Sequence, residues 1–180
     1  MLFRSGTFAD SAEFRRSGGY EIVEVEGIRI ALIAFTKGMD NLGLPAGSED
    51  CVNLLYEDYS TDYKKVDTDR IERVLRNVSE EQPDITIAML HWGSEYNDEI
   101  SDSQEKIRKQ LQAGGVDIIV GSHPHLVQRI DYDPIAQTLD SCSSGAYLQL
   151  GTGPSGLYWS VHGSASPVTW RVGLSWQGPV

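Results

Sequence analysis

The sequence predicts an α/β (α+β) fold in which helices flank a mixed sheet. Strand and helix patterns alternate along the middle of the chain, from residue 28 to residue 120. The strand segments are apolar throughout, which is typical of strands that are covered on both faces. Each helix segment carries one apolar stripe that can cover a face of such a sheet. At 180 residues the chain is long enough to bury a core of its own.

The first predicted element is a β-hairpin over residues 20–36. Apolar residues interleave with glutamates in its first strand, and Gly27 makes the turn into a second strand that is apolar on both faces. Residues 36–67 contain several glycines and a proline, and we predict a long surface loop there. Loops of this length without regular structure often line a functional site.

Two helices are predicted from the spacing of apolar side chains. Over residues 67–81 these side chains recur at i, i+3, i+4 and i+7, and acidic residues at the start suit the positive end of the helix dipole. Over residues 101–115, Ser101 and Gln104 form a candidate capping box, and two glycines end the helix. Each helix is followed by a buried strand, which makes a parallel or mixed sheet the expected arrangement.

The composition changes after about residue 139. Residues 140–180 are rich in serine and glycine, contain no lysine or glutamate, and hold three of the four tryptophans. Two interpretations stay open: a set of closing antiparallel strands, or a segment foreign to the domain, as a reading-frame error would produce. We therefore divide the chain into a lead-in over residues 1–18, a domain over residues 19–139 and an atypical tail.

Charge and composition exclude several classes of partner. Asp+Glu number 26 against 15 for Lys+Arg, a formal charge of -11, so we expect no nucleic-acid partner. The two cysteines, Cys51 and Cys142, form no CxxC pattern and indicate neither a zinc knuckle nor a disulfide scaffold. No apolar run approaches the length of a membrane span and no export signal is recognised, so we expect no direct membrane insertion.

Three histidines follow two of the predicted strands. The strand over residues 84–92 has His91 at its end, and the strand over residues 116–120 is followed by His123 and His125. Because parallel strands end at one edge of a sheet, we expect the three imidazoles to meet there. The intervening proline favours an extended backbone at His123, and imidazoles held in this way suit zinc, manganese or iron.

Each of these residues also has a plainer interpretation. A His-Pro-His pair is compatible with a solvent-facing turn whose rings bond to nearby carbonyls. Glu95 is a candidate metal ligand, an orienter of a histidine or a general acid/base, and it is equally compatible with a solvated loop. We assign Trp92 to core packing and give His162 no role. Asp40 and Asn41 are further candidates for the same crevice.

Three segments together resemble a known family. They are "GIRIALIAFT" at 27–36, "LHWGSEY" at 90–96 and "GSHPHLVQ" at 121–128. The combination resembles the C-terminal half of the CapA family of bacterial capsule-synthesis (poly-γ-glutamate) proteins, which lies within the calcineurin-like metallophosphoesterase superfamily. The resemblance covers residues 19–131 and implies part of a two-layer sandwich flanked by helices, with a metal site at the strand ends.

By this resemblance His91, His123 and His125 would be ligands of a divalent metal ion, namely manganese, zinc or iron. His91 and Glu95 would be the catalytic candidates of a metal-dependent phosphoesterase or hydrolase, with a histidine protonating the leaving group. The partner would be a capsule or other cell-envelope polymer. The intact family form would be extracytoplasmic and membrane-associated.

The resemblance also indicates what this chain departs from. The family's earlier half supplies an aspartate, a further acidic residue and an Asn-His pair, and these motifs have no counterpart here. Since two divalent ions a few Å apart repel strongly without a bridging carboxylate, we expect at most one weakly held metal ion and little or no turnover by this chain alone. Two rival hypotheses stay open: a non-catalytic scaffold domain for an envelope polymer, and an inactive gene fragment.

Overall fold

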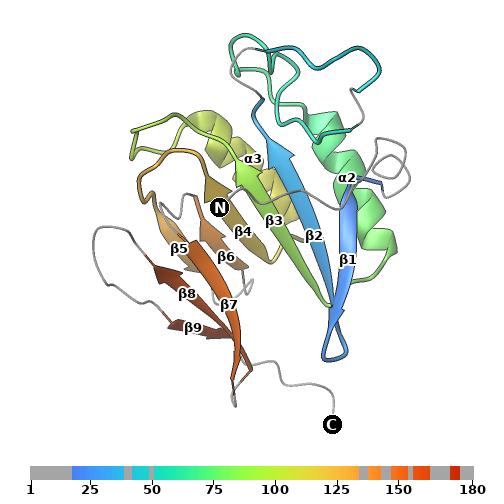
Figure 1. Ribbon diagram of the computed structural model, residues 1–180, viewed down its shortest axis with the longest axis vertical. Helices are drawn as coiled ribbons and strands as arrows, with labels where there is room; N and C mark the ends of the chain where they lie inside the picture. Colours follow the sequence, from blue (N-terminus) through green and yellow to red (C-terminus); the bar gives the residue numbers. More distant parts are fainter. Residues whose placement is uncertain are drawn as a thin grey trace.

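The computed structural model describes residues 18–38, 42–48, 51–133 and 138–142, together with the backbone of three later strands. Its first sheet has six strands in the order β1-β2-β3-β4-β6-β5, and Figure 1 shows helices α2 and α3 behind it. The strands are β1 (Tyr20–Val25), β2 (Ile28–Thr36), β3 (Ile85–His91), β4 (Ile118–Ser122), β5 (Ile130–Asp133) and β6 (Thr138–Ser141). The helices are α2 (Thr68–Glu80) and α3 (Asp102–Ala113).

The six-stranded sheet is mixed. β2, β3, β4 and β6 run parallel to one another, whereas β1 and β5 pair antiparallel at the two edges. The predicted α/β fold class and the hairpin of β1 and β2 are therefore confirmed. β5 and β6 were not predicted, because each has four residues and neither shows a clear apolar pattern.

The main core lies between the sheet and the two helices. Four buried residues of α2 form the predicted stripe: Ile71, Val74, Leu75 and Val78. They pack in one cluster with buried side chains of the strands and of α3, including Ile33, Leu90, Ile107, Leu111 and Ile119. A second cluster consists of Ile30, Ile87, Ile118 and Leu139, which alternate along their strands with residues of the main core.

Both helices begin with side-chain caps. Asp67 accepts a hydrogen bond from the backbone N–H of Arg70 at 3.0 Å at the start of α2. At the start of α3, the Gln104 backbone N–H donates to the Ser101 hydroxyl at 3.2 Å, and Ser101 N–H donates to the Gln104 side chain at 3.1 Å. The predicted capping box is therefore confirmed.

The segment between β2 and α2 is not wholly a surface loop, and this part of our prediction is wrong. Asn53, Leu54, Leu55 and Tyr56 are buried. The Leu55 backbone N–H donates to the Thr36 carbonyl at 2.9 Å, which holds this stretch against the end of β2. The short apolar run at these residues was the available signal. A run this short does not distinguish a buried segment from an exposed loop.

Three strands lie beyond residue 142. β7 (Tyr147–Gly153), β8 (Gly156–His162) and β9 (Arg171–Leu174) form an antiparallel sheet in that order. The interpretation of these segments as short strands is confirmed. The domain boundary expected at residue 139 falls within β6. Asp40 and Asn41 lie outside the described residues, and none of the helices described is long and apolar enough to cross a membrane.

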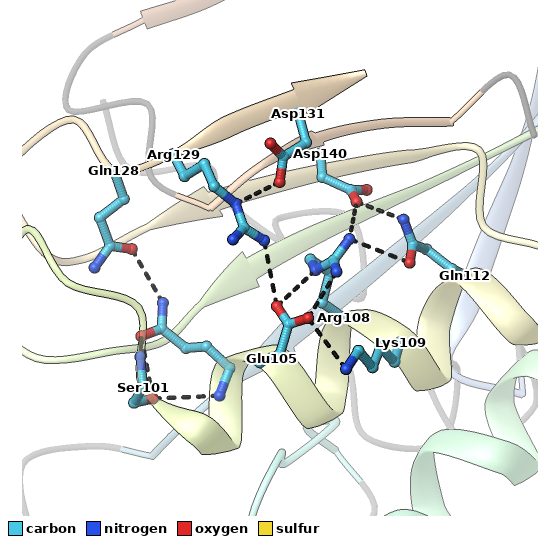
Figure 2. A network of polar contacts seen from close by, with 10 residues as sticks. Ser101, Glu105, Arg108, Lys109, Gln112, Gln128, Arg129, Asp131 and Asp140 are labelled. Carbon is cyan, nitrogen blue, oxygen red and sulfur yellow. Dashed lines mark hydrogen bonds and ion pairs between the residues drawn. The ribbon is translucent and has the colours of Figure 1, made fainter. Parts of the chain in front are cut away.

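A polar network joins α3 to β5 and β6 (Figure 2). Arg108 of α3 donates to the buried Asp140 carboxylate at 2.9 Å and to Glu105 at 2.8 Å. The Gln112 side chain donates to the same Asp140 oxygen at 2.6 Å. Arg129 also pairs with Glu105, at 3.3 Å. The network fixes the strand pair that follows the histidine loop to the helix behind the sheet.

Glu105 should make the stability of the fold depend on acid pH. The hydrogen bond from Arg108 lowers the pKa of Glu105 from 4.5 to about 2. Because the pKa is lower in the folded state, the stabilisation is present above about pH 4.5 and is lost as the pH falls toward 2. We expect Glu105→Gln to cost about 1 kcal/mol at pH 7, after allowance for solvent screening. Urea unfolding should show this difference narrowing between pH 5 and pH 3; a difference that stays constant would contradict the assignment.

Candidate functional site

Three parallel strands end side by side at one edge of the sheet. Thr36, His91 and Ser122 are the last residues of β2, β3 and β4 and face one another in register. The pairing continues one residue further, since Lys37 N–H donates to the His91 carbonyl at 2.7 Å and Trp92 N–H donates to the Ser122 carbonyl at 3.2 Å. The loops that follow these strands therefore start next to one another.

The three predicted histidines lie in these loops and at the end of β3. The ring centroids of His91 and His123 are 4.4 Å apart, and those of His123 and His125 are 6.3 Å apart. His91 and His125 are exposed, whereas His123 is half-buried. The rings thus form a row at the sheet edge. Within the described residues, no three His, Cys, Asp or Glu side chains form a group that could hold a metal ion.

The backbone of the His-Pro-His segment is not extended, and this prediction is wrong. His123 has φ 98° and His125 has φ 58°, both in the left-handed region. His91 is paired with Ser122, so an extended His123 would lie opposite Trp92. Its ring would then point to the same side of the sheet as the buried Trp92, which is the core side. The left-handed turn instead brings the His123 ring beside His91. Such conformations cost of order 1–3 kcal/mol each and gather at functional sites.

Two residues at the carboxyl end of β2 contact the histidine rings, and sequence reasoning missed both of them. The Thr36 hydroxyl lies 3.1 Å from His91 Nδ1, and Lys37 Nζ lies 3.3 Å from His123 Nε2. Lys37 also donates to the Gly93 carbonyl at 3.0 Å. Thr36 ends an apolar strand and Lys37 follows it, which was the available signal. Their approach to the histidines depends on the strand order, which no local pattern specifies.

These contacts indicate how each ring is oriented. The Thr36 hydroxyl lies 3.1 Å from His91 Nδ1 and 3.3 Å from the Gly38 carbonyl, which accepts a hydrogen bond from it. Lys37 has only donors, so it contacts His123 through the lone pair on Nε2. Burial lowers the pKa of His123, and the neighbouring His91 and Lys37 lower it further, which favours the neutral ring.

Glu95 lies beside the third histidine. Its carboxylate is 3.7 Å from His125 Nε2, and both side chains are about half exposed. The Tyr96 ring stacks on His125 with centroids 5.7 Å apart, and Tyr96 N–H donates to the Pro124 carbonyl at 2.8 Å. Glu95 is thus placed to orient His125 or to exchange a proton with it. This contact does not distinguish the roles that the sequence left open.

The imidazoles at this edge include two adjacent candidate ligands for a divalent ion. The rings of His91 and His123 stand next to each other, and a hydroxyl beside Nδ1 of His91 is the kind of partner that orients a metal-binding histidine. Imidazole suits zinc, manganese and iron. Glu95 adds a carboxylate beside His125, but the described His, Cys, Asp and Glu side chains do not form a group of three that could hold an ion.

A buried pair of amides fixes the two loops of the site to each other. Gln104 Nε2 donates to Gln128 Oε1 at 3.0 Å, and both side chains are buried. Gln128 in turn donates to the carbonyls of Asn97 and Glu99 at 3.0 and 3.1 Å. Figure 2 shows Gln128 approaching the start of α3. The loop with Glu95 is therefore tied to the loop with the His-Pro-His segment.

Trp92 packs in the core as predicted, and Asp117 also has a structural role. Trp92 is fully buried, and its indole N–H donates to the Cys142 carbonyl at 2.7 Å. The Asp117 carboxylate accepts from the Thr86 N–H at 2.7 Å and caps the opposite edge of the sheet. His162 lies in β8, away in sequence from the other three histidines.

Two solved structures align with part of the chain. A hypothetical protein from Thermus thermophilus aligns with a TM-score of 0.44 and 17% identity, over 74% of this chain and 40% of its own. A protein from Mycoplasma pneumoniae described as a novel phosphatase aligns with a TM-score of 0.45 and 14% identity, over 79% of this chain and 38% of its own.

Two sequence relatives have a higher identity to this chain than these structures, but only over a short stretch. The PGA biosynthesis protein CapA of Bacillus subtilis (strain 168) is 40% identical over 48 residues, which are 27% of this chain and 13% of the relative. The capsule biosynthesis protein CapA of Bacillus anthracis is 44% identical over 48 residues, or 12% of its length. The matched stretch thus spans about an eighth of either relative.

The family match is much longer. The profile of the family described as bacterial capsule synthesis protein PGA_cap matches residues 2–139. This range contains the whole of the strand and helix alternation through β4, and the three histidines at the sheet edge. The chain therefore belongs to the bacterial capsule synthesis protein family.

Proposed function

We propose that this domain acts in the synthesis of a capsule polymer such as poly-γ-glutamate, and that its sheet edge binds one divalent metal ion. The single observation that carries the proposal is the row of imidazoles, with His91 and His123 4.4 Å apart at the ends of adjacent parallel strands. His91, His123 and His125 would hold the ion, which we expect to be manganese, zinc or iron. Family membership supports the choice of a capsule polymer as the substrate class.

The metal ion, when bound, would supply Lewis acidity to a scissile phosphoester or amide oxygen and to a water molecule. The protein's own groups would handle the protons. His91 would act at Nε2 either as a ligand of the ion or in proton transfer, and Thr36, 3.1 Å from its Nδ1, would orient the ring in both cases. Glu95 and His125 lie 3.7 Å apart and would form a second proton-transfer pair at the exposed end of the row.

We expect catalysis to be weak in this chain by itself. We expect the three imidazoles to hold at most one ion, and the two-ion chemistry of phosphoester hydrolysis needs further ligands. The intact protein would work outside the cytoplasm and in association with the membrane, as the family resemblance implies. A binding or scaffold role for the polymer would use the same exposed edge without turnover.

Metal-dependent melting tests the proposal. Protein treated with EDTA and then given Mn²⁺, Zn²⁺ or Fe²⁺ at about 100 times the dissociation constant should gain roughly 2.7 kcal/mol of stability. For a domain of this size, that gain is a rise in melting temperature of about 5–10 °C. His123→Ala should remove most of the rise, whereas His162→Ala, at the fourth histidine, should leave it unchanged.

Hydrolysis of a generic phosphodiester, measured on the same samples, separates the functional alternatives. A metal-induced shift with turnover that is lost in both His91→Ala and Glu95→Gln supports the enzyme. A shift without turnover supports a scaffold with a structural metal ion. No shift with any of the three ions, or an equal shift in His123→Ala, would contradict the proposed metal site.

A further inference from the structure

The ammonium group of Lys37 lies beside the middle histidine of the row, His123. Lys37 directly follows β2, and its backbone N–H bonds to the His91 carbonyl at 2.7 Å. Its Nζ lies 3.0 Å from the Gly93 carbonyl and 3.3 Å from His123 Nε2. The ring of Tyr63 lies on another side, with its centroid 4.6 Å from Nζ. A carbonyl, an imidazole nitrogen and an aromatic face therefore surround one positive charge.

The contact with His123 uses the atom that a metal ion would need. An ammonium group has three donors and no acceptor, so it contacts His123 Nε2 through the lone pair of that nitrogen. A metal ion binds imidazole through the same lone pair. One nitrogen cannot serve both partners at once. The positive charge of Lys37 would also repel a divalent ion bound close to it.

Lys37 has other partners that would hold it after it leaves His123. The Gly93 carbonyl and the Tyr63 ring both accept a cation, and neither depends on the imidazole. The lysine is half-buried, and its four-carbon side chain can move by rotation without a change in the backbone. The site can therefore exist in two states: an ammonium on His123, or a metal ion on His123 with the ammonium withdrawn.

We propose that Lys37 regulates metal loading of the site by competing with the divalent ion for Nε2 of His123. This inference rests on the proposed metal site and gives a reason why its affinity would be low. In the metal-free protein Lys37 holds the ring of His123 through its contact with Nε2. Each ion that binds His123 there must displace the ammonium group.

Titration with Co²⁺, followed by its visible absorption and by calorimetry, tests the competition without reference to activity. Lys37→Met keeps the length of the side chain and removes the charge and the donors, and it should bind Co²⁺ about tenfold more tightly or better than the unmodified protein. Lys37→Arg keeps the charge and should stay within about threefold of the unmodified protein. Lys109→Met removes an exposed charge on α3 and should change the affinity less than about twofold.

The outcomes separate this inference from the proposed function. Tighter binding in Lys37→Met alone supports the competition, including the case in which only this variant binds measurably. If the unmodified protein binds Co²⁺ through His123, and Lys37→Met binds it equally or more weakly, the proposed competition is overturned. The proposed metal site then still stands. Equal tightening in Lys37→Arg overturns it as well. No binding in either the unmodified protein or Lys37→Met overturns both. Melting of the metal-free variants verifies that each one folds.

Discussion

Replacing Arg108 with methionine is expected to lower the free energy of unfolding by about 3–5 kcal/mol, because it leaves a buried carboxylate without its cation. The side chain of Asp140 is 3% exposed and that of Arg108 14% exposed, and the two are 2.9 Å apart. Burial raises the pKa of Asp140, and the pairing with Arg108 opposes that rise. Urea unfolding at pH 7 measures the loss.

Two further variants determine whether the charge is the cause. Asp140→Asn added to Arg108→Met should recover at least about 1 kcal/mol, since it removes the unpaired charge. Lys109→Ala, which breaks only the exposed contact with Glu105, should cost less than about 1 kcal/mol. The Arg108→Met variant should also gain stability as the pH falls from 7 to 5, because the raised pKa of Asp140 favours the protonated carboxyl in the folded state. A loss below about 1 kcal/mol in Arg108→Met would contradict a structural role for the network.

Replacing Gly121 with alanine is expected to cost about 3 kcal/mol or more, the upper end of what overpacking costs in cores. An added Cβ would lie 1.9 Å from the Cys142 carbonyl oxygen and 2.6 Å from Trp92 Nε1. The first neighbour is backbone and the second is a fully buried indole, so neither can give way without a shift of β4 or of the segment after β6. Thermal melting measures the cost.

The same substitution should disturb the site, because His123 comes two residues after Gly121. We expect the metal-induced melting shift to shrink in Gly121→Ala even where the protein is still folded. Gly43→Ala is the matched control: its Cβ would meet no atom within 4 Å, and the change in stability should stay within about 0.5 kcal/mol. A Gly121→Ala protein as stable as the control would contradict the close packing at this glycine.

Local patterns accounted for most of the fold around the site. The stripe of α2 and the capping box of α3 follow from short-range physics, since spacing and caps act within one or two helical turns. The same holds for the hairpin, whose turn needs the positive φ of Gly27. β5 and β6 could not be found in this way. Their pairing, and the burial of Thr138 and Asp140, come from contacts with β4 and α3.

The candidate site was predictable in its residues and not in its geometry. The histidines were recognisable because each follows an apolar strand, and Glu95 because it follows His91 in the same loop. The left-handed backbone at His123 was not recognisable, since the proline after it favours the opposite conformation in an isolated chain. The contacts of Lys37 and Thr36 with the rings were missed because each joins two residues that lie far apart in the sequence. The separation is 86 positions for Lys37 and His123 and 55 positions for Thr36 and His91.

By itself, the sequence determined the alternation of helices and buried strands, the order in which they come, and the three imidazoles as the chemistry the chain carries. These properties depend on side-chain type and on spacing over a few residues. Only the tertiary structure decided that β2, β3 and β4 are neighbours, that His123 turns back toward His91, and that Lys37 contacts His123. The physical reason is that packing against Trp92 and Cys142 selects one backbone path out of several that local sequence allows.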